Sequence, residues 1–300
     1  MLMNKQKIHP EGPTFSRVIA GAWRWNLLPP AEVPALVRAA LDLGITTFDH
    51  ADIYGDYSNE EIFGRALLHE AALKQQVQIV TKCGIKLMSG KKPEHRIKHY
   101  DTSREHIVSS AEQSLKLLGI EKIDLLLLHR PDPLMNVDEV ATAFQQLRSS
   151  GKVLHFGVSN FTPSQFELLQ SVLPFPLVTN QIELSLFHHA PLFDGTIDSL
   201  YKRKVTAMAW SPLGGGKLLD PNHDTGRKAL EQARPLMEKH QANLSQLLLA
   251  WLMHHPSNVF PVVGTGKAER LREAAHAVNI SLDRQDWFEM LKWARGADVP

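Results

Sequence analysis

A short apolar segment followed by a longer amphipathic segment recurs eight times along this chain, and this repeat limits the choice of fold. The apolar segments lack the polar alternation of a half-solvated strand, which is typical of parallel strands that are buried on both faces. The eight predicted strands span residues 18–22, 46–50, 78–82, 123–129, 154–158, 178–182, 206–210 and 259–263.

The segments between these strands have the 3.6-residue period of helices. One predicted helix has a capping box at Thr102 and Glu105 and ends at Gly119. The apolar faces predicted for three of the helices are Ile107, Ala111, Leu115 and Leu118; Ala35, Ala39 and Leu43 before Gly44; and Leu244, Leu248 and Leu252 before Pro256.

Eight strand–helix units in about 280 residues favour an α/β fold of the (β/α)8 TIM-barrel type, although this alternation also occurs in doubly wound sheets. The polar residues favour the barrel, because reactive groups collect where barrel strands end. Such residues end or follow six consecutive strands: Asp49, Lys82, His129, Ser159 with Asn160, Gln181, and Ser211. We therefore expect a single barrel domain over residues 1–300.

The charge and cysteine content exclude several classes of protein. Lys plus Arg number 33 and Asp plus Glu number 32, so the net charge is +1. That balance gives no overall attraction to nucleic acid or to anionic membranes. The single cysteine, Cys83, cannot form an intrachain disulfide. With no apolar targeting segment in view, we expect a soluble, cytoplasmic protein. Because no interface segment is evident in the sequence, we expect a monomer.

Asp49, Tyr54, Lys82 and His129 form a group that suits proton transfer to a carbonyl oxygen. A tyrosine with a pKa near ~10 is a poor acid at neutral pH. A nearby ammonium lowers that pKa, and a carboxylate keeps the ammonium charged. A histidine beside the phenol can hydrogen-bond the substrate oxygen. Each residue taken alone also has a structural explanation, such as a helix cap or a packing aromatic ring.

The chain resembles the aldo-keto reductase superfamily, particularly a bacterial oxidoreductase branch of it, over about residues 17–280. Residues 41–61 resemble its Gly-x-x-x-x-Asp-x-Ala-x-x-Tyr-Gly signature. The further motifs, in family order, are IVTKCG at 79–84, IDLLLLHRPDP at 123–133, GVSN at 157–160, Asn180-Gln181, WSPL at 210–213 and PVVGTGKAERLR at 261–272.

The resemblance implies NADPH-dependent reduction of an aldehyde or ketone by direct hydride transfer, without a metal. It implies that Tyr54 is the proton donor, that Lys82 and Asp49 adjust its pKa, and that His129 orients the carbonyl substrate. The residues that it implies for cofactor binding are Ala22, Trp23, Ser159, Asn160, Gln181, Trp210, Ser211, Pro212, Leu213, Gly214, Gly216, Lys217, Gly264, Thr265, Gly266, Lys267, Arg270 and Glu273.

Within that set, Ser159, Asn160 and Gln181 would hold the nicotinamide amide, and Trp210 would stack on the ring. The segment that ends at Lys217 would cradle the pyrophosphate. Lys267 and Arg270 would meet the 2′-phosphate, with Lys267 replacing a lysine that family members carry at the position of Gly264.

Three other functions compete with carbonyl reduction as interpretations of the sequence. A Schiff-base aldolase would use Lys82 without a nicotinamide. A short-chain reductase needs an early Gly-x-x-x-Gly-x-Gly turn and a Tyr-x-x-x-Lys pair, which this sequence lacks. A nicotinamide-binding redox sensor or regulatory subunit with slow turnover stays open. A metal site at Asp49-His50-Ala51-Asp52 is not expected, because His50 would face away from Asp49.

Overall fold

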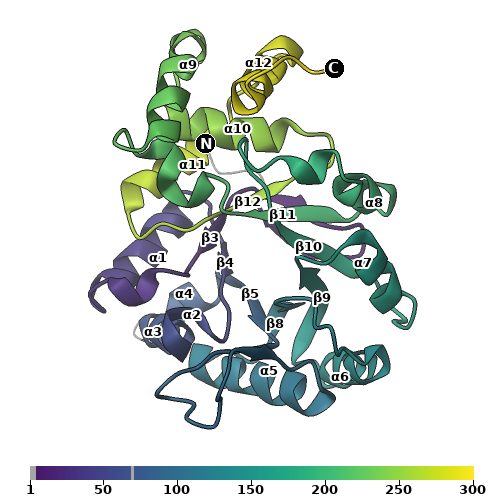
Figure 1. Cartoon of the computed structure of the whole chain (residues 1–300). Helices are drawn as coiled ribbons and strands as arrows, with labels where there is room; N and C mark the ends of the chain where they lie inside the picture. Colours follow the sequence, from purple (N-terminus) through teal and green to yellow (C-terminus); the bar gives the residue numbers. More distant parts are fainter. Residues whose placement is uncertain (1–4, 69–70) are drawn as a thin grey trace.

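The computed structural model describes residues 5–68 and 71–300, and in them eight parallel strands close into a barrel surrounded by helices (Figure 1). The strands run around the barrel in chain order, and the last one pairs with the first. They are β3 (Ile19–Gly21), β4 (Thr47–Asp49), β5 (Gln78–Cys83), β8 (Ile123–Leu128), β9 (Val153–Ser159), β10 (Leu177–Glu183), β11 (Thr206–Trp210) and β12 (Phe260–Val263). All eight predicted strands and the (β/α)8 barrel are thus confirmed.

Helices cover the outside of the barrel. The longer ones are α1 (Glu32–Asp42), α3 (Asn59–Leu68), α5 (Arg104–Leu118), α6 (Val137–Ser149), α7 (Pro163–Gln170), α8 (Thr196–Lys202), α9 (Asp224–His240), α10 (Leu244–His254), α11 (Ala268–Ala277) and α12 (Arg284–Arg295). Short helical turns are α2 (Tyr54–Tyr57), α4 (Ala71–Lys74), η1 (Trp25–Leu27), η2 (Ala190–Leu192) and η3 (Gly214–Leu219). In the described part of the chain, no helix has the length and apolar character needed to cross a membrane.

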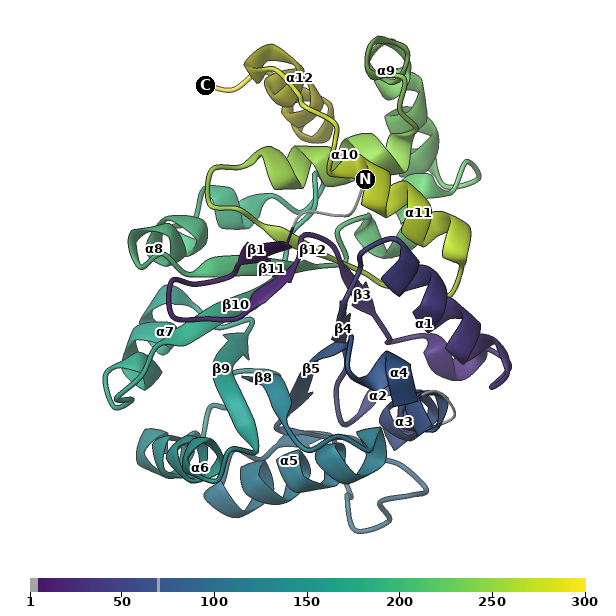
Figure 2. The same ribbon diagram turned by 180° about the vertical axis from the view of Figure 1, so that it is seen from behind.

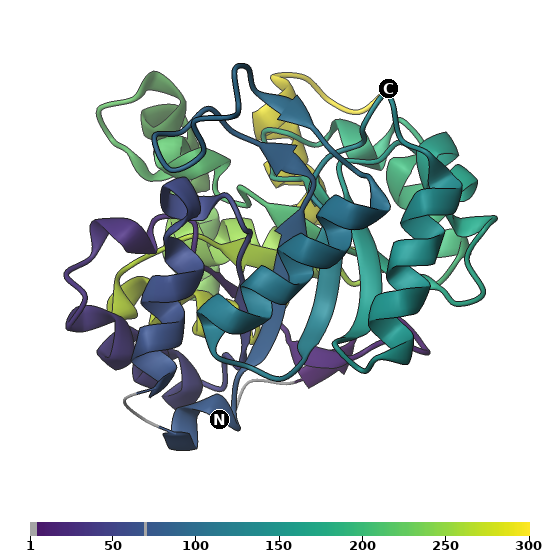
Figure 3. The ribbon, with the colours of Figure 1, turned by 90° about the horizontal axis from the view of Figure 1, so that it is seen from below.

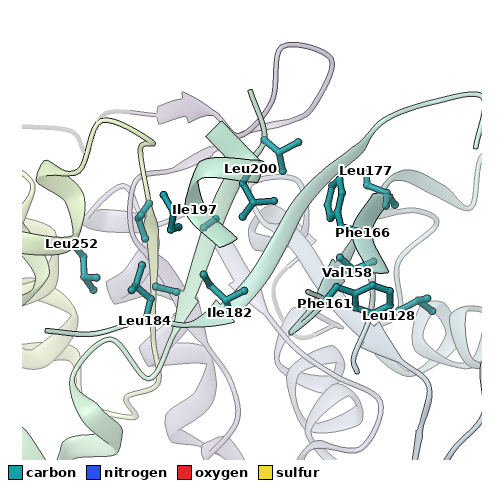
Figure 4. Close-up of a cluster of buried hydrophobic side chains, with 14 of the residues drawn as sticks. Leu128, Val158, Phe161, Phe166, Leu177, Ile182, Leu184, Ile197, Leu200 and Leu252 are labelled. Carbon is teal, nitrogen blue, oxygen red and sulfur yellow. The ribbon is translucent and has the colours of Figure 1, made fainter. Parts of the chain in front are cut away.

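Apolar side chains fill both the barrel and the layer between barrel and helices. Figure 4 shows part of that outer layer, where Phe166 of α7 and Ile197 of α8 pack against strand residues such as Val158 and Ile182. Inside the barrel, Val80, Leu125 and other strand residues form a separate buried cluster. The strands are therefore apolar on both faces, which explains why they were recognisable as continuous apolar runs.

Two small antiparallel hairpins lie at opposite ends of the barrel. The first joins β1 (Lys5–Lys7) to β2 (Thr14–Ser16) and lies across one end, as Figure 2 shows from behind. The second joins β6 (Ile85–Lys86) to β7 (His99–Tyr100) at the other end, at the top of Figure 3. Neither hairpin is predictable from the sequence, because their strands are too short to show a pattern.

Two helix predictions are corrected by the structure. The cap of α5 is Ser103, whose side chain accepts from the His106 backbone N–H, so the capping box predicted at Thr102 and Glu105 is wrong. The Thr102 hydroxyl instead donates to Asp132 Oδ2 at 2.9 Å. In α1 the buried face is Val33, Leu36, Val37 and Ala40, whereas Ala35 of the predicted face is exposed. The predicted apolar faces of α5 and α10 do pack against the core.

Candidate active site

Four polar side chains predicted to act together meet at the carboxyl end of the barrel. Asp49 ends β4, Lys82 lies near the end of β5, His129 follows β8, and Tyr54 begins the α2 turn. Lys82 Nζ lies 2.7 Å from Asp49 Oδ2, 2.7 Å from the His50 carbonyl oxygen and 3.0 Å from Tyr54 Oη. With all three of its N–H groups donated, Lys82 leaves the Tyr54 hydroxyl proton free to bond elsewhere.

The charges within this group follow from burial and from the Lys82–Asp49 pair. Burial alone would lower the pKa of Lys82, but Asp49 and Tyr54 together outweigh it, so the pKa is raised and the ammonium stays charged. Burial raises the pKa of Tyr54, and the Lys82 ammonium offsets only part of that effect. The expected net lowering of the Tyr54 pKa is therefore wrong, because desolvation exceeds the attraction of the lysine. Tyr54 holds its proton at neutral pH.

His129 lies beside Tyr54, with ring centroids 5.8 Å apart and planes at 77°. Burial first, and then the nearby cations Lys82 and Arg130, hold the pKa of His129 well below its usual range. The ring is therefore neutral, and one of its nitrogens carries a hydrogen-bond donor. Its Nδ1 is buried without a partner among the described residues.

The residues predicted for the nicotinamide amide form a second polar cluster that touches the first. Ser159 Oγ accepts from Asn160 Nδ2 at 2.7 Å, and Asn160 Oδ1 accepts from Trp210 Nε1 at 2.9 Å. Gln181 Nε2 donates to Asp49 Oδ1 at 2.7 Å. Asp49 therefore accepts on both carboxylate oxygens, from Lys82 on one and from Gln181 on the other.

The backbone at this end of the barrel departs from ordinary geometry where the predicted cofactor residues lie. Asn160 and Ser211 have φ values of 61° and 50°, which residues other than glycine rarely adopt. Such strained residues collect at functional sites. Pro212 and Leu213 follow directly, and then Gly214, Gly215 and Gly216 have φ values of 60°, 66° and 95°.

The predicted phosphate-binding segments lie on neighbouring loops. Thr265 contacts the β3–α1 loop through its carbonyl, which accepts from Trp25 Nε1 at 3.0 Å. This contact brings the segment of Ala22 and Trp23 close to that of Gly264 and Gly266. Lys217, Lys267 and Arg270 are exposed, and in the part of the chain that the structure describes none of them pairs with a carboxylate. Glu273 instead accepts from the Ser245 hydroxyl at 3.0 Å.

Two buried carboxyls, those of Asp52 and Glu60, are not recognisable as a pair in the sequence. Asp52 Oδ2 accepts from Ser110 Oγ at 2.9 Å, and Glu60 Oε1 accepts from Thr81 Oγ1 at 2.6 Å. Burial raises the pKa of Asp52 to about 8 and that of Glu60 to about 7. Glu60 is followed by the half-exposed Glu61, so the sequence does not indicate which of the two faces inward.

The remaining candidate groups are structural. The His50 ring packs against the Phe63 ring of α3, with ring centroids 4.5 Å apart. His50 therefore lies on the helix side of the barrel and faces away from Asp49, as predicted. Cys83 is a buried core residue. Within residues 5–68 and 71–300, no cluster of three His, Cys, Asp or Glu side chains could hold a metal ion.

Comparison with known proteins identifies the family. The family model of the aldo/keto reductases matches residues 17–293. The chain is 48% identical to oxidoreductase YdhF of Escherichia coli over the full length of both, and 43% identical to a 6-dehydroglucose reductase of Agrobacterium fabrum over 95% of this chain and 96% of the relative.

A solved structure has the same fold. A crystal structure of the thermostable aldo-keto reductase Tm1743, in complex with the inhibitor epalrestat, superimposes with a TM-score of 0.82 at 26% identity. The match covers 97% of this chain and all of that one. With a matching family model, full-length relatives and the barrel itself in agreement, this chain belongs to the aldo/keto reductase family and is an oxidoreductase.

Proposed function

We propose that this protein reduces aldehydes or ketones to alcohols with NADPH, and that Tyr54 is the proton donor. The observation that carries the proposal is the buried contact of 3.0 Å between Lys82 Nζ and Tyr54 Oη, with Asp49 on the other side of the ammonium. The name of the Agrobacterium relative, 6-dehydroglucose reductase, also indicates reduction of a carbonyl by that protein.

The chain's own residues divide the proton chemistry between them. The neutral His129 donates a hydrogen bond to the substrate carbonyl oxygen and orients it toward Tyr54. Tyr54 gives its hydroxyl proton to that oxygen, and the Lys82 ammonium stabilises the tyrosinate that forms. Asp49 keeps Lys82 charged, and Gln181 fixes Asp49. A bound nicotinamide supplies the hydride.

The residues present fit such a cofactor. Trp210 offers a ring at the strand ends, held by its bond to Asn160, beside the amides of Asn160 and Gln181. Gly215 and Gly216 have no atom within 4 Å of an added Cβ, which leaves their backbone open to an approaching group. Lys217, Lys267 and Arg270, which pair with no carboxylate of the described residues, supply positive charge for phosphates, and a 2′-phosphate would favour NADPH over NADH.

We further propose that residues 1–300 act as one barrel domain. The strands of the barrel span Ile19 to Val263, and the last helix, α12, packs against α10 in the surrounding helices. There Trp287 of α12 stacks on Trp251 of α10, with ring centroids 4.8 Å apart.

The test is NADPH consumption by the purified protein with a panel of small aldehydes and ketones, together with an NADH comparison. Tyr54→Phe removes the hydroxyl that carries the transferable proton, and we expect turnover to fall by roughly 100-fold or more. A Tyr201→Phe variant is the control, because Tyr201 is exposed on α8. Normal turnover in Tyr54→Phe would contradict the proposal. Tight NADPH binding without turnover would favour a sensor.

A further inference from the structure

A second cation lies at the reacting end of the barrel and has no carboxylate partner among the residues that the structure describes. Arg130 directly follows His129 and is partly buried. Its guanidinium carbon lies 5.5 Å from the centre of the Trp210 ring. Strands β9 and β10 stand between β8 and β11 in the barrel, so the Arg130 side chain reaches across the mouth to make this contact.

The two cations near Tyr54 differ in how their charge is balanced. Lys82 forms an ion pair with Asp49 at 2.7 Å. Arg130 forms no ion pair or hydrogen bond with a carboxylate anywhere in the described ranges, and its guanidinium lies over the aromatic face of Trp210. Arg130 also lowers the pKa of His129, as does Lys98 of the β6–β7 hairpin. The mouth around Tyr54 is therefore electropositive.

We propose that Arg130 binds an anionic group on the substrate, so that the preferred substrates are carbonyl compounds that carry a carboxylate or a phosphate. The inference rests on the proposed carbonyl reduction. A guanidinium binds either group through two parallel hydrogen bonds, which also fixes the orientation of the substrate.

The cofactor phosphates are unsuitable as the partner of the Arg130 guanidinium. The loops predicted to hold them carry their own cations, Lys217, Lys267 and Arg270. Arg130 instead adjoins His129 and acts electrostatically on both His129 and Tyr54, which places it at the hydride-transfer end. The nicotinamide becomes positively charged when it is oxidised, so an unpaired guanidinium there would repel it unless an anion is bound beside it.

The kinetic test compares matched substrates that differ in charge. Succinic semialdehyde and butanal form the carboxylate pair; glyceraldehyde 3-phosphate and glyceraldehyde form the phosphate pair. We expect kcat/KM to favour the charged member of at least one pair by roughly 10- to 100-fold. Arg130→Gln should remove that preference, so that kcat/KM falls by at least roughly tenfold more for the charged member of the pair than for its neutral counterpart, and Arg130→Lys should restore part of the preference.

Arg148→Gln is the matched control. Arg148 also lies over an aromatic ring, 4.3 Å from the centre of Phe175, but it is in the last turn of α6, at the opposite end of the barrel. The Arg148→Gln variant should prefer charged over neutral substrates as strongly as the wild type does. Equal losses on charged and neutral substrates in Arg130→Gln, or a wild type that prefers neutral aldehydes or 6-dehydroglucose to both charged substrates, would overturn the inference.

A binding measurement separates this inference from the proposed function. Calorimetry with succinate and with inorganic phosphate, each with and without NADP+, requires no turnover. We expect one of the two anions to bind the wild type and to bind Arg130→Gln at least roughly tenfold more weakly. Such binding without any aldehyde reduction would support the anion site and contradict the reductase. Equal binding to both proteins, or no binding to either, would contradict the anion site even if reduction occurs.

Discussion

At the scale of single residues, the buried carboxyl of Glu60 makes stability depend on pH. Its pKa in the folded protein is about 7, whereas an exposed glutamate titrates near ~4.3. The folded state therefore keeps a proton that the unfolded state releases. The stabilisation of the folded state by this retained proton is fully present below about pH 4 and is lost as the pH rises through about 7.

Glu60→Gln removes the titration and keeps an oxygen that can accept from the Thr81 hydroxyl. Between pH 5 and pH 9, we expect the wild type to lose on the order of 2–3 kcal/mol more unfolding free energy than Glu60→Gln does. Urea unfolding at several pH values measures this difference. Glu61→Gln is the control, since Glu61 is half-exposed beside Arg65. Parallel pH profiles for wild type and Glu60→Gln would refute the prediction.

The same scale shows what the sequence could and could not predict about the site. Asp49, Tyr54, Lys82 and His129 carry recognisable motif positions, and strand ends gather at one rim, so their meeting was predictable. Their hydrogen bonds were not, because a bond such as Gln181 to Asp49 joins residues 132 positions apart. The net pKa of Tyr54 was mispredicted because burial cannot be weighed against a nearby charge until both are located.

At the scale of elements, long apolar runs were predictable, whereas helix faces and caps depended on packing. The β5 and β8 runs are buried throughout their central residues, so their composition alone identifies them. The α1 face was predicted from alanines, yet Val33 and Leu36 bury larger side chains and determine the face instead. Ser103 was available next to Thr102, and only the backbone conformation decides which of the two caps α5.

The contact between α3 and α5 gives a prediction at this scale. A Cβ at Gly64 of α3 would lie 2.0 Å from the Leu117 carbonyl oxygen and 2.9 Å from Leu118 Cα, both in α5. Gly64→Ala should therefore destabilise the protein by about 1–3 kcal/mol, although alanine favours an isolated helix by up to about 1 kcal/mol.

Thermal or urea unfolding measures the effect of Gly64→Ala. Gly90→Ala is the control, because an added Cβ at Gly90 meets no atom within 4 Å, and its stability should change by about 0.5 kcal/mol or less. A Gly64→Ala protein as stable as the wild type would mean that α3 and α5 can move apart at little cost.

At the scale of the whole molecule, the repeat of eight units was enough to predict the barrel, but not how its amino end is closed. The β1–β2 hairpin closes it: Ile8 and Phe15 are fully buried and join the cluster inside the barrel. The Ile8 carbonyl accepts from the backbone N–H of Thr206 in β11 at 3.1 Å. The hairpin therefore closes the end of the barrel that lies opposite Asp49, Tyr54, Lys82 and His129.

Arg17, which follows β2, connects this closed end to the last barrel unit. Its guanidinium donates to the carbonyl oxygens of Met253 at 3.1 Å and of Val259, and its Cζ lies 4.8 Å from the centre of the Phe260 ring. Burial lowers the pKa of Arg17 to about 10, so it stays charged at neutral pH. Arg17→Met keeps the apolar stem but leaves these carbonyls without their donor.

We expect Arg17→Met to lose about 2–4 kcal/mol of unfolding free energy. Well below its melting temperature, turnover per folded molecule should match the wild type, because Asp49, Tyr54, Lys82 and His129 lie at the far end of the barrel. Lys7→Met is the control: Lys7 is exposed in the same hairpin and bonds only the Pro10 carbonyl, so its removal should cost about 0.5 kcal/mol or less. Equal stability of the two variants would show that Arg17 does not anchor the closed end, and reduced turnover in folded Arg17→Met would show that the two ends of the barrel are coupled.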